Sequence, residues 1–467
     1  MGERSFSYPY IPNSVPEIKR EMMREVGVND IMALYEEIPE HLRFKGKLNM
    51  PDAILDEYSI KRHVSDILNK NANCEDNLNF LGAGCAQHFV PAVCDEINGR
   101  GEFLTAYVGE AYADHGKWQA FFEYSSLMAE LLDMDILSVP LYDGAQAVAT
   151  SLRMAVRATG RNQVLVPATM NPETAAIAQN YVDGPGAPQV ELVEVGYDPK
   201  TGLLDLADLK AKISDGTAAV CIENPTFLGL IESQAEEIGK IARAAGAEFV
   251  VACDPISLGV LAPPAQYGAT LACGDLHPLG IHLNGGGGQG GFVATHDEMR
   301  LINEFKDLMF GLTETVEQGE YGFGEVLFDR TSYGSRDEGK EFTGTSTGLW
   351  AITAGVYLAL MGPNGMEEVG ETIMQRAQYA AKQISALDGI SLAFGGSFFK
   401  EFVVNFDGTG KSVAEINAAL REHSIFGGKD LSADFPAHGQ SALYCVTEIM
   451  TKADIDKLVG ALAAVSA

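Results

Sequence analysis

Short apolar runs alternate with longer amphipathic stretches between residues 136 and 296, and this alternation constrains the fold more than any other feature. The amphipathic stretches, such as GAQAVATSLRMAVRAT at 144–159 and ESQAEEIGKIARAAG at 232–246, have the spacing of helices with one buried face. The apolar runs lie at 136–142, 163–167, 189–195, 218–223, 248–253, 270–274 and 291–296. Such strands, alternating with helices, predict a large doubly wound α/β domain built on a mostly parallel seven-stranded sheet.

The rest of the chain predicts smaller parts on either side of this sheet. A chain of 467 residues is too long for one compact core, so a large and a small domain are expected. The predicted boundaries are 1–75 for an N-terminal helical arm, 76–330 for the large α/β domain and 331–467 for a small C-terminal α+β domain. Within these, 300–345 is expected to be an irregular connection, and long helices are expected at 346–360 and 366–387.

Charge and cysteine content limit the class of protein. Acidic residues outnumber basic ones by 64 to 33, which gives a net charge of −31 and excludes nucleic acid or an anionic membrane surface as a partner. The N-terminus has no apolar core of a secretory signal, and no run of apolar residues is long enough to span a membrane. Seven cysteines, mostly in apolar surroundings, fit reduced thiols, so we expect a cytoplasmic protein.

Asp254 and the run Gly285–Gly288 are the residues that point to a cofactor. Asp254 follows the apolar run 248–253, and ligands of open parallel sheets bind beyond the carboxyl ends of the strands. A carboxylate there can hold the protonated ring nitrogen of pyridoxal phosphate, and glycines with positive φ can lie against its flat ring. Taken alone, Asp254 could be a turn cap and the glycines a turn without a ligand. Together they indicate a pyridoxal-phosphate-type domain with Asp254, Gly285 and Gly286 at the cofactor site.

One group that such a site needs is missing. The stretch 274–294 contains no lysine, and the next lysine along the chain is Lys306, so no nearby amine is available for a Schiff base. The turn 142–145 could hold a phosphate at the start of a helix, but acidic Asp143 argues against this unless it only caps the helix.

Other kinds of enzyme site are not indicated. His277 and His282 are five residues apart and His88 is far from both, with no cysteine pair to complete a zinc site, so no metal is predicted. No GxSxG, P-loop or GxGxxG motif occurs in a suitable context, which removes serine hydrolases, nucleotide triphosphatases and nicotinamide enzymes.

Nine segments of the chain resemble a known family. They are YIPNS (10–14), IPEHLRFKGKLNMP (38–51), FLGAGCAQHFVPAV (80–93), EFLTAY (102–107), YDGAQA (142–147), DPISLGVLAPPAQYGA (254–269), YLALMGPNGMEEV (357–369), FFKEFVVNF (398–406) and YCVTEIMTKADID (444–456). They look like the first subunit of the two-subunit glycine decarboxylase, in the P-protein family of the glycine cleavage system. The similarity runs from about residue 8 to 465, and the segments at 80–93 and 444–456 are the most specific.

The resemblance implies a division of labour between two homologous chains. In that family the second subunit carries the lysine, in a histidine–lysine pair before a four-glycine turn. Aligning that turn on Gly285–Gly288 places His277 on the histidine and Pro278 at the lysine position. The implied fold is that of pyridoxal-phosphate-dependent transferases (fold type I), with the cofactor bound covalently by the partner subunit and not by this chain. The implied reaction turns glycine and an oxidised lipoyl group into carbon dioxide and an aminomethylated lipoyl arm on H-protein.

Three residues in the matching segments are candidates for the shared active site. The resemblance offers Tyr107 and Thr105 as catalytic groups and His88 as their polar neighbour, with ordinary core packing as the alternative for each. On the same reading, Asp254, Gly285 and Gly286 are relics of a cofactor site.

Three departures from the family pattern leave other functions open. The segments 108–119 and 330–347 differ from the family sequence, and Asn171–Pro172 replaces a histidine–proline pair. One alternative is a subunit of a paralogous pyridoxal-phosphate-dependent decarboxylase or lyase for another small amino acid. The other is a catalytically inert scaffold or regulatory pseudoenzyme, because the missing lysine fits that class as well.

Overall fold

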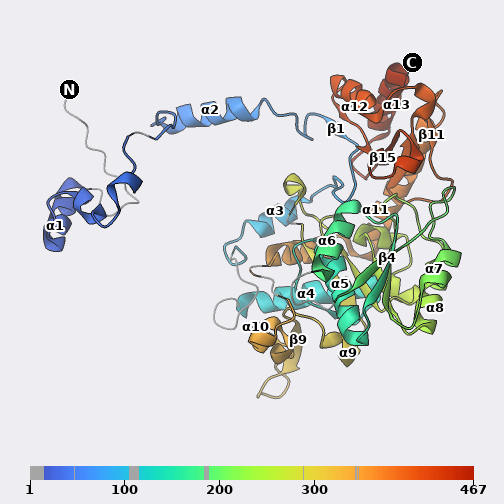
Figure 1. Cartoon of the computed structure of the whole chain (residues 1–467), viewed down its shortest axis with the longest axis horizontal. Coiled ribbons are helices and arrows are strands. Elements are labelled where there is room, and N and C mark those ends of the chain that lie inside the picture. The colour runs from blue at the N-terminus through green and yellow to red at the C-terminus, as the bar shows by residue number, and fades with distance from the viewer. Residues whose placement is uncertain are drawn as a thin grey trace. The chain divides into compact units, whose positions relative to one another are not determined.

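The computed structural model describes residues 15–46, 48–104, 115–183, 189–287, 289–341, 344 and 346–466. The chain forms two compact units, Met1–Ala72 and Asn73–Ala467 (Figure 1). The division of the second unit near residue 330 stays a prediction. No helix among the described residues is long and apolar enough to cross a membrane.

The N-terminal unit contains helices α1 (Pro16–Val26) and α2 (Glu57–Leu68) and short 3-10 helices at Ile31–Tyr35 and Glu40–Leu42. Local sequence sets the helix ends. Helix α1 stops at Gly27, which has a φ of 83°, and Asp56 caps α2 by accepting a hydrogen bond from the Ser59 N–H. Neither α1 nor α2, all of whose residues are described, contains a buried residue.

The second unit is built on a sheet of seven strands in the order β2-β8-β7-β6-β5-β3-β4. The strands are β2 (Ile136–Leu137), β3 (Gln163–Pro167), β4 (Glu191–Val195), β5 (Thr217–Glu223), β6 (Glu248–Ala252), β7 (Leu271–Asp275) and β8 (Gly291–Thr295). Strands β3 to β7 pair in parallel, and β8 runs antiparallel to both β7 and β2. The predicted mostly parallel seven-stranded sheet is therefore confirmed.

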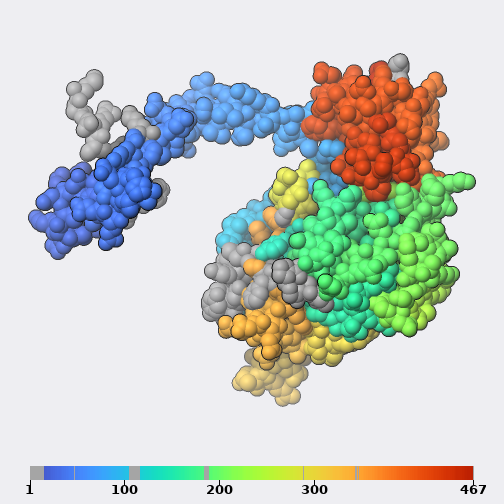
Figure 2. Space-filling view, viewed as in Figure 1, coloured from blue at the N-terminus to red at the C-terminus, as the bar shows by residue number. Residues whose placement is uncertain are grey.

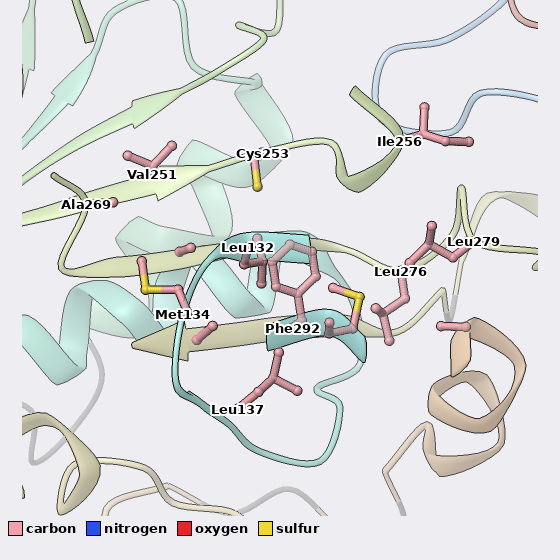
Figure 3. Packing of buried hydrophobic residues seen from close by; sticks show 14 of the residues in the cluster. Leu132, Met134, Leu137, Val251, Cys253, Ile256, Ala269, Leu276, Leu279 and Phe292 are labelled. Atoms are coloured by element: carbon pink, nitrogen blue, oxygen red, sulfur yellow. The ribbon is translucent and has the colours of Figure 1, made fainter. Parts of the chain in front are cut away.

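Both faces of this sheet are buried, as its continuous apolar strands require. On one face lie α5 (Gly144–Thr159) and α6 (Pro172–Val182), and on the other lie α4 (Trp118–Leu132), α8 (Ala235–Ala244) and much of α11 (Gly348–Ile384). Val250 points to the first face and its neighbour Val251 to the second. Figure 3 shows Val251 in the core on the second face, together with Leu132 and Phe292. Each such buried side chain stabilises the fold by about 1.5–3 kcal/mol.

The connection predicted to be irregular between 300 and 345 contains a hairpin. Strands β9 (Phe310–Glu314) and β10 (Tyr321–Glu325) pair antiparallel, and short helices α9 (Met299–Ile302) and α10 (Ser332–Ser335) flank them. The two predicted long helices form the single span α11, which is broken at Gly362 (φ 57°, ψ −175°) immediately before Pro363. Since Pro363 lacks a backbone N–H and Gly362 has left the helical conformation, the axis changes direction there.

A smaller antiparallel sheet forms the C-terminal part, with strand order β11-β12-β15-β14. Its strands are β11 (Ser391–Leu392), β12 (Glu401–Asn405), β14 (Lys429–Asp430) and β15 (Ser441–Cys445), and its helices are α12 (Val413–Glu422) and α13 (Lys452–Ser466). Helices α12, α13 and the end of α11 share one core with this sheet. Figure 2 shows this part in red beside the green segments of the large sheet. Among the described residues, the remaining α-helices and strands are α3 (Ala92–Asn98), α7 (Leu206–Lys212) and the parallel pair β1 (Leu78–Asn79) and β13 (Ile425–Phe426).

Candidate functional site

A cavity of about 290 Å³ lies at the carboxyl ends of β5, β6 and β7. These strand ends contribute Glu223, Asp254 and Asp275 to its lining. The lining also includes the segment 83–86, the first residues of α5 and α6, the glycine-rich turn, and Lys400 with Glu401 from the start of β12. Its position is the one at which open α/β sheets bind their ligands.

Asp254 is paired with a lysine that comes from the other sheet. Its Oδ1 caps the turn after β6 by accepting the Ile256 N–H, and its Oδ2 lies 2.6 Å from the Lys400 Nζ. Burial would raise the pKa of Asp254, but Lys400, His88 and the Ile256 N–H together outweigh burial and lower it. Both predicted features of Asp254 are therefore present, the turn cap and the strand-end carboxylate, but its charge is already neutralised within the chain.

His88 extends this ion pair into a buried network. Its Nε2 lies 3.2 Å from the Lys400 Nζ, and its Nδ1 lies 2.8 Å from Glu448 Oε2. Because an ammonium can only donate, the neutral tautomer that suits both contacts carries its proton on Nδ1 and donates it to Glu448. Burial would raise the pKa of Glu448, but the His88 ring and the Phe89 N–H lower it to about 2. His88 is thus a second partner of the Lys400 ammonium beside Asp254.

The turn after β7 supplies His277 and Pro278, and both line the cavity. His277 is 2% exposed, and its ring meets that of His88 edge-on, with 6.4 Å between the ring centroids. Burial, together with the nearby ammonium of Lys400, lowers the pKa of His277 to about 3, so its imidazole is neutral. Lys306 does not line the cavity, and its ammonium lies 3.2 Å from Glu341.

Carboxylates accept hydrogen bonds from two of the backbone N–H groups at the start of α5 that could otherwise bind a phosphate. At the start of α5, Asp143 accepts the Gln146 N–H at 2.7 Å, and Asp275 accepts the Gly144 N–H at 3.3 Å. A phosphate at this helix end would stand beside two acidic side chains, which repel it.

The residues of this cavity do not fit pyridoxal phosphate. That cofactor needs an amine for its aldehyde, free N–H groups for its phosphate and an unpaired carboxylate for its ring nitrogen. Pro278 offers no amine, the Gly144 and Gln146 N–H groups at the start of α5 are engaged by carboxylates, and Asp254 is paired with Lys400. Among the described residues, no group of three or more His, Cys, Asp or Glu side chains could hold a metal ion.

The structure places the predicted residues unevenly. Asp254 and Gly286 line the cavity. His88 does not line it but contacts Lys400, which does. Gly285 does not line the cavity either, but it precedes Gly286 in the turn Asn284–Gly286. Thr105, Tyr107 and Gly288 lie outside the described residues. The residues that the sequence did not single out are Lys400, Glu401, Glu223, Asp275 and Glu448. Lys400 and Glu401 could have been found from the sequence, because they are two charged residues inside the apolar stretch FFKEFVVNF. Charged residues in such a stretch are expected to be buried and therefore to have partners.

Comparisons with known proteins agree with this architecture. The sequence pattern of the family described as Glycine cleavage system P-protein matches residues 9–462. Two relatives named "Probable glycine dehydrogenase (decarboxylating) subunit 1" are each 38% identical: one from Staphylothermus marinus, matched over 98% of each chain, and one from Carboxydothermus hydrogenoformans, over 97% of this chain and 99% of the relative.

Solved structures give the same result. The crystal structure of a glycine decarboxylase (P-protein) of the glycine cleavage system, in inhibitor-bound form, matches with a TM-score of 0.85 and 31% identity, covering 98% of this chain and all of that one. A sphingosine-1-phosphate lyase from Burkholderia pseudomallei has a TM-score of 0.63 at 13% identity, covers 92% of this chain and 94% of its own, and shows the shared fold alone. The chain belongs to the glycine cleavage system P-protein family.

Proposed function

We propose that the chain is the non-anchoring subunit of a heteromeric glycine dehydrogenase (decarboxylating, aminomethyl-transferring). Together with a lysine-bearing homologous second subunit, it would decarboxylate glycine and transfer the aminomethyl group to the lipoyl arm of H-protein. The support is full-length similarity to proteins named subunit 1 of glycine dehydrogenase (decarboxylating). Seven free cysteines, of which five are buried, support a reducing compartment, and we propose the cytoplasm.

The observation that carries this proposal is the cavity that does not fit the cofactor. The P-protein family is dependent on pyridoxal phosphate, which supplies an electron sink for the loss of carbon dioxide. In this chain Pro278 stands at the cavity where a Schiff-base lysine is required, and Lys400 is engaged by Asp254 and His88. On this proposal, another chain anchors the cofactor.

The contribution of this chain to the shared site is a separate part of the proposal. Thr105 and Tyr107 would reach the active site of the partner subunit as polar groups that contact substrate. His88 would act from within this chain, because Glu448 and Lys400 fix both of its ring nitrogens. A scaffold without any catalytic group would require none of these three side chains.

Expression of the chain with and without its lysine-bearing partner tests the proposal. The complex is expected to absorb as an internal aldimine and to lose that absorption on borohydride reduction, whereas the chain alone shows neither property. Mass spectrometry should place the reduced adduct on the partner, and an adduct on this chain, at Lys117 or Lys306 for example, would contradict the proposal.

Two further readouts separate the alternative functions. Exchange of labelled bicarbonate into glycine by the reconstituted pair and H-protein is expected, and exchange with another small amino acid only would identify a paralogous enzyme. Alanine at Tyr107 or His88 should lower this exchange in a complex that still forms. Unchanged exchange in both variants would favour a scaffold.

A further inference from the structure

The cavity has a strong imbalance of charge. Six carboxylates line it, against the single ammonium of Lys400. They are Asp143, Glu173, Glu223, Asp254, Asp275 and Glu401. Because Lys400 is paired with Asp254, the other five have no cationic side chain opposite them among the described lining residues. A ligand that complements this lining must bring positive charge.

The same lining has more hydrogen-bond acceptors than donors. Glu223 and Asp275 each accept two backbone N–H bonds, and Glu401 accepts one from Ala83 at 2.6 Å. An ionised carboxylate has about four acceptor positions, so each of these groups retains capacity. A matching ligand must therefore also carry hydrogen-bond donors.

His277 gives independent evidence of a missing partner. Its side chain is 2% exposed and lines the cavity, yet its ring nitrogens have no hydrogen-bond partner in the described part of the chain. Buried polar groups are nearly always hydrogen-bonded, and a neutral imidazole offers one donor and one acceptor. The acceptor nitrogen is one more position that an incoming N–H group can satisfy.

The available space limits the ligand to a small molecule. A volume of about 290 Å³ is at the lower end for ligand pockets. A Cβ atom placed on Gly286 or Gly287 would meet no atom within 4 Å, so the glycine-rich turn leaves its side of the cavity open. The acceptors belong to the ends of different strands and do not form a metal-binding group within the described residues, which favours a polyatomic cation.

We propose that this cavity binds a small primary ammonium ion, carried either by an amino acid or by a simple alkylamine. Such an ion brings one positive charge and three N–H donors, which match the unpaired carboxylates and the free imidazole nitrogen. A phosphate brings negative charge and acceptors, so the groups that exclude pyridoxal phosphate are those that favour an ammonium. The inference concerns a cavity of this chain alone and does not depend on the proposed function.

Proton release accompanies this binding. Burial raises the pKa of both Glu223 and Asp275 to about 7, and Glu401 beside Glu223 and Asp143 and Asp254 beside Asp275 act in the same direction. An ammonium favours the ionised carboxylates, so its affinity increases as the pH rises through about 7. Below that pH, each binding event releases protons to the buffer. Lys400, on the Asp254 side, opposes cation binding at every pH in this range because Asp254 keeps it protonated.

Isothermal titration calorimetry of the full chain with methylammonium chloride at pH 8 tests the proposal. Methylammonium is expected to bind saturably. Tetramethylammonium, which has the same charge but no N–H donor, is expected not to bind. Glycine, titrated in parallel, identifies the source. Glycine binding as well supports an amino acid as the natural ligand, and methylammonium binding without glycine supports an alkylamine. If methylammonium does not bind, or tetramethylammonium binds equally well, the proposal is wrong.

Variants locate the bound ion. Glu223→Gln and Asp275→Asn are each expected to weaken methylammonium binding by about ten- to a hundredfold, because each removes a charge-assisted hydrogen bond. Glu236→Gln, on the exposed face of α8, removes the same charge outside the cavity and should leave the affinity unchanged. Circular dichroism checks that each variant is folded, and either cavity variant suffices if the other does not fold. Wild-type affinity in the folded cavity variants would place the ion elsewhere and overturn the proposal.

Discussion

Replacing Lys400 by methionine tests whether its ammonium neutralises the candidate site from within the chain. Its Nζ lies 2.6 Å from Asp254 Oδ2, and the two side chains are only 12% and 16% exposed. Methionine has a similar unbranched shape and lacks the charge. The variant therefore leaves Asp254 as a buried carboxylate without a cation, and leaves the Nε2 of His88 without a donor.

The structure sets the expected size of this effect. Removing one member of a buried ion pair costs about 3–5 kcal/mol, because the remaining charge is uncompensated. The C-terminal unit has roughly 400 residues, and an unfolding entropy of about 2.1 cal/mol/K per residue converts this cost into a decrease of about 4–6 °C in Tm.

The loss should also depend on pH. In the wild type, Lys400 lowers the folded-state pKa of Asp254 against burial. The pair therefore contributes stability above the unfolded pKa of about 3.9, and this contribution is lost as the pH falls through the folded pKa. In Lys400→Met, burial is opposed only by His88 and the Ile256 N–H, so the pKa of Asp254 is higher than in the wild type. The difference in Tm between the two proteins should be largest near pH 8 and should decrease toward pH 5, as Asp254 of the variant becomes protonated.

Thermal unfolding followed by circular dichroism at pH 8, 6.5 and 5 measures both effects. Lys240→Met is the matched control, since Lys240 also lies 2.7 Å from a carboxylate, that of Glu236, but the two side chains are 55% and 68% exposed. An exposed pair contributes at most about 1 kcal/mol, so the control should lose no more than about 1 °C. Equal losses in Lys400→Met and Lys240→Met, or a loss that does not change with pH, would refute the reasoning.

Two further predictions concern the cavity acids and the break in α11. Burial raises the folded-state pKa of Glu223 to about 7, so the wild type is expected to lose stability as the pH rises from about 4 to 7. Glu223→Gln should reduce that loss by on the order of 3 kcal/mol, measured by urea unfolding at a series of pH values. An unchanged pH slope would contradict this. Gly362→Ala should cost about 1–3 kcal/mol, because a Cβ disfavours φ 57° and ψ −175°, whereas Gly460→Ala, in α13 with nothing near its Cβ, should stabilise by about 0.5–1 kcal/mol. Thermal unfolding of both variants measures these changes. Changes in Tm of the same sign in Gly362→Ala and Gly460→Ala would contradict this account of the break in α11.

The large sheet could be predicted because its strands are buried on both faces and therefore read as uninterrupted apolar runs. The hairpin β9–β10 could not, since Gly311, Gly322 and Gly324 weaken the strand signal and only Phe310 of its residues is buried. The two strands pair with each other over only five residues each, and the sequence around them is rich in charged residues and glycine.

The candidate site was predictable to the extent that it depends on local sequence. Asp254 follows an apolar run, so its position at a strand end could be inferred from its neighbours. Its partner could not, because Lys400 belongs to the other sheet and is far along the chain. The same holds for His88 and Glu448, which the fold brings to 2.8 Å from opposite ends of the second unit. Periodicity and motif spacing carry no information about such contacts.

The missing lysine and the presence of Lys400 are parts of one electrostatic problem. A parallel sheet that keeps an acidic residue at a buried strand end must neutralise it, since an isolated buried charge costs several kcal/mol. Asp254 is neutralised by an ammonium from within the chain, whereas Glu223 and Asp275 have pKa values raised to about 7 and can be neutralised by protonation. These two ways of neutralising an acid respond differently to an added cation. The Asp254–Lys400 pair is already neutral and is not stabilised further, whereas Glu223 and Asp275 release their protons and pair with the cation. The methylammonium titrations of the Glu223 and Asp275 variants therefore test the acids that protonation neutralises, and the Lys400→Met pH profile tests the acid that an ammonium neutralises.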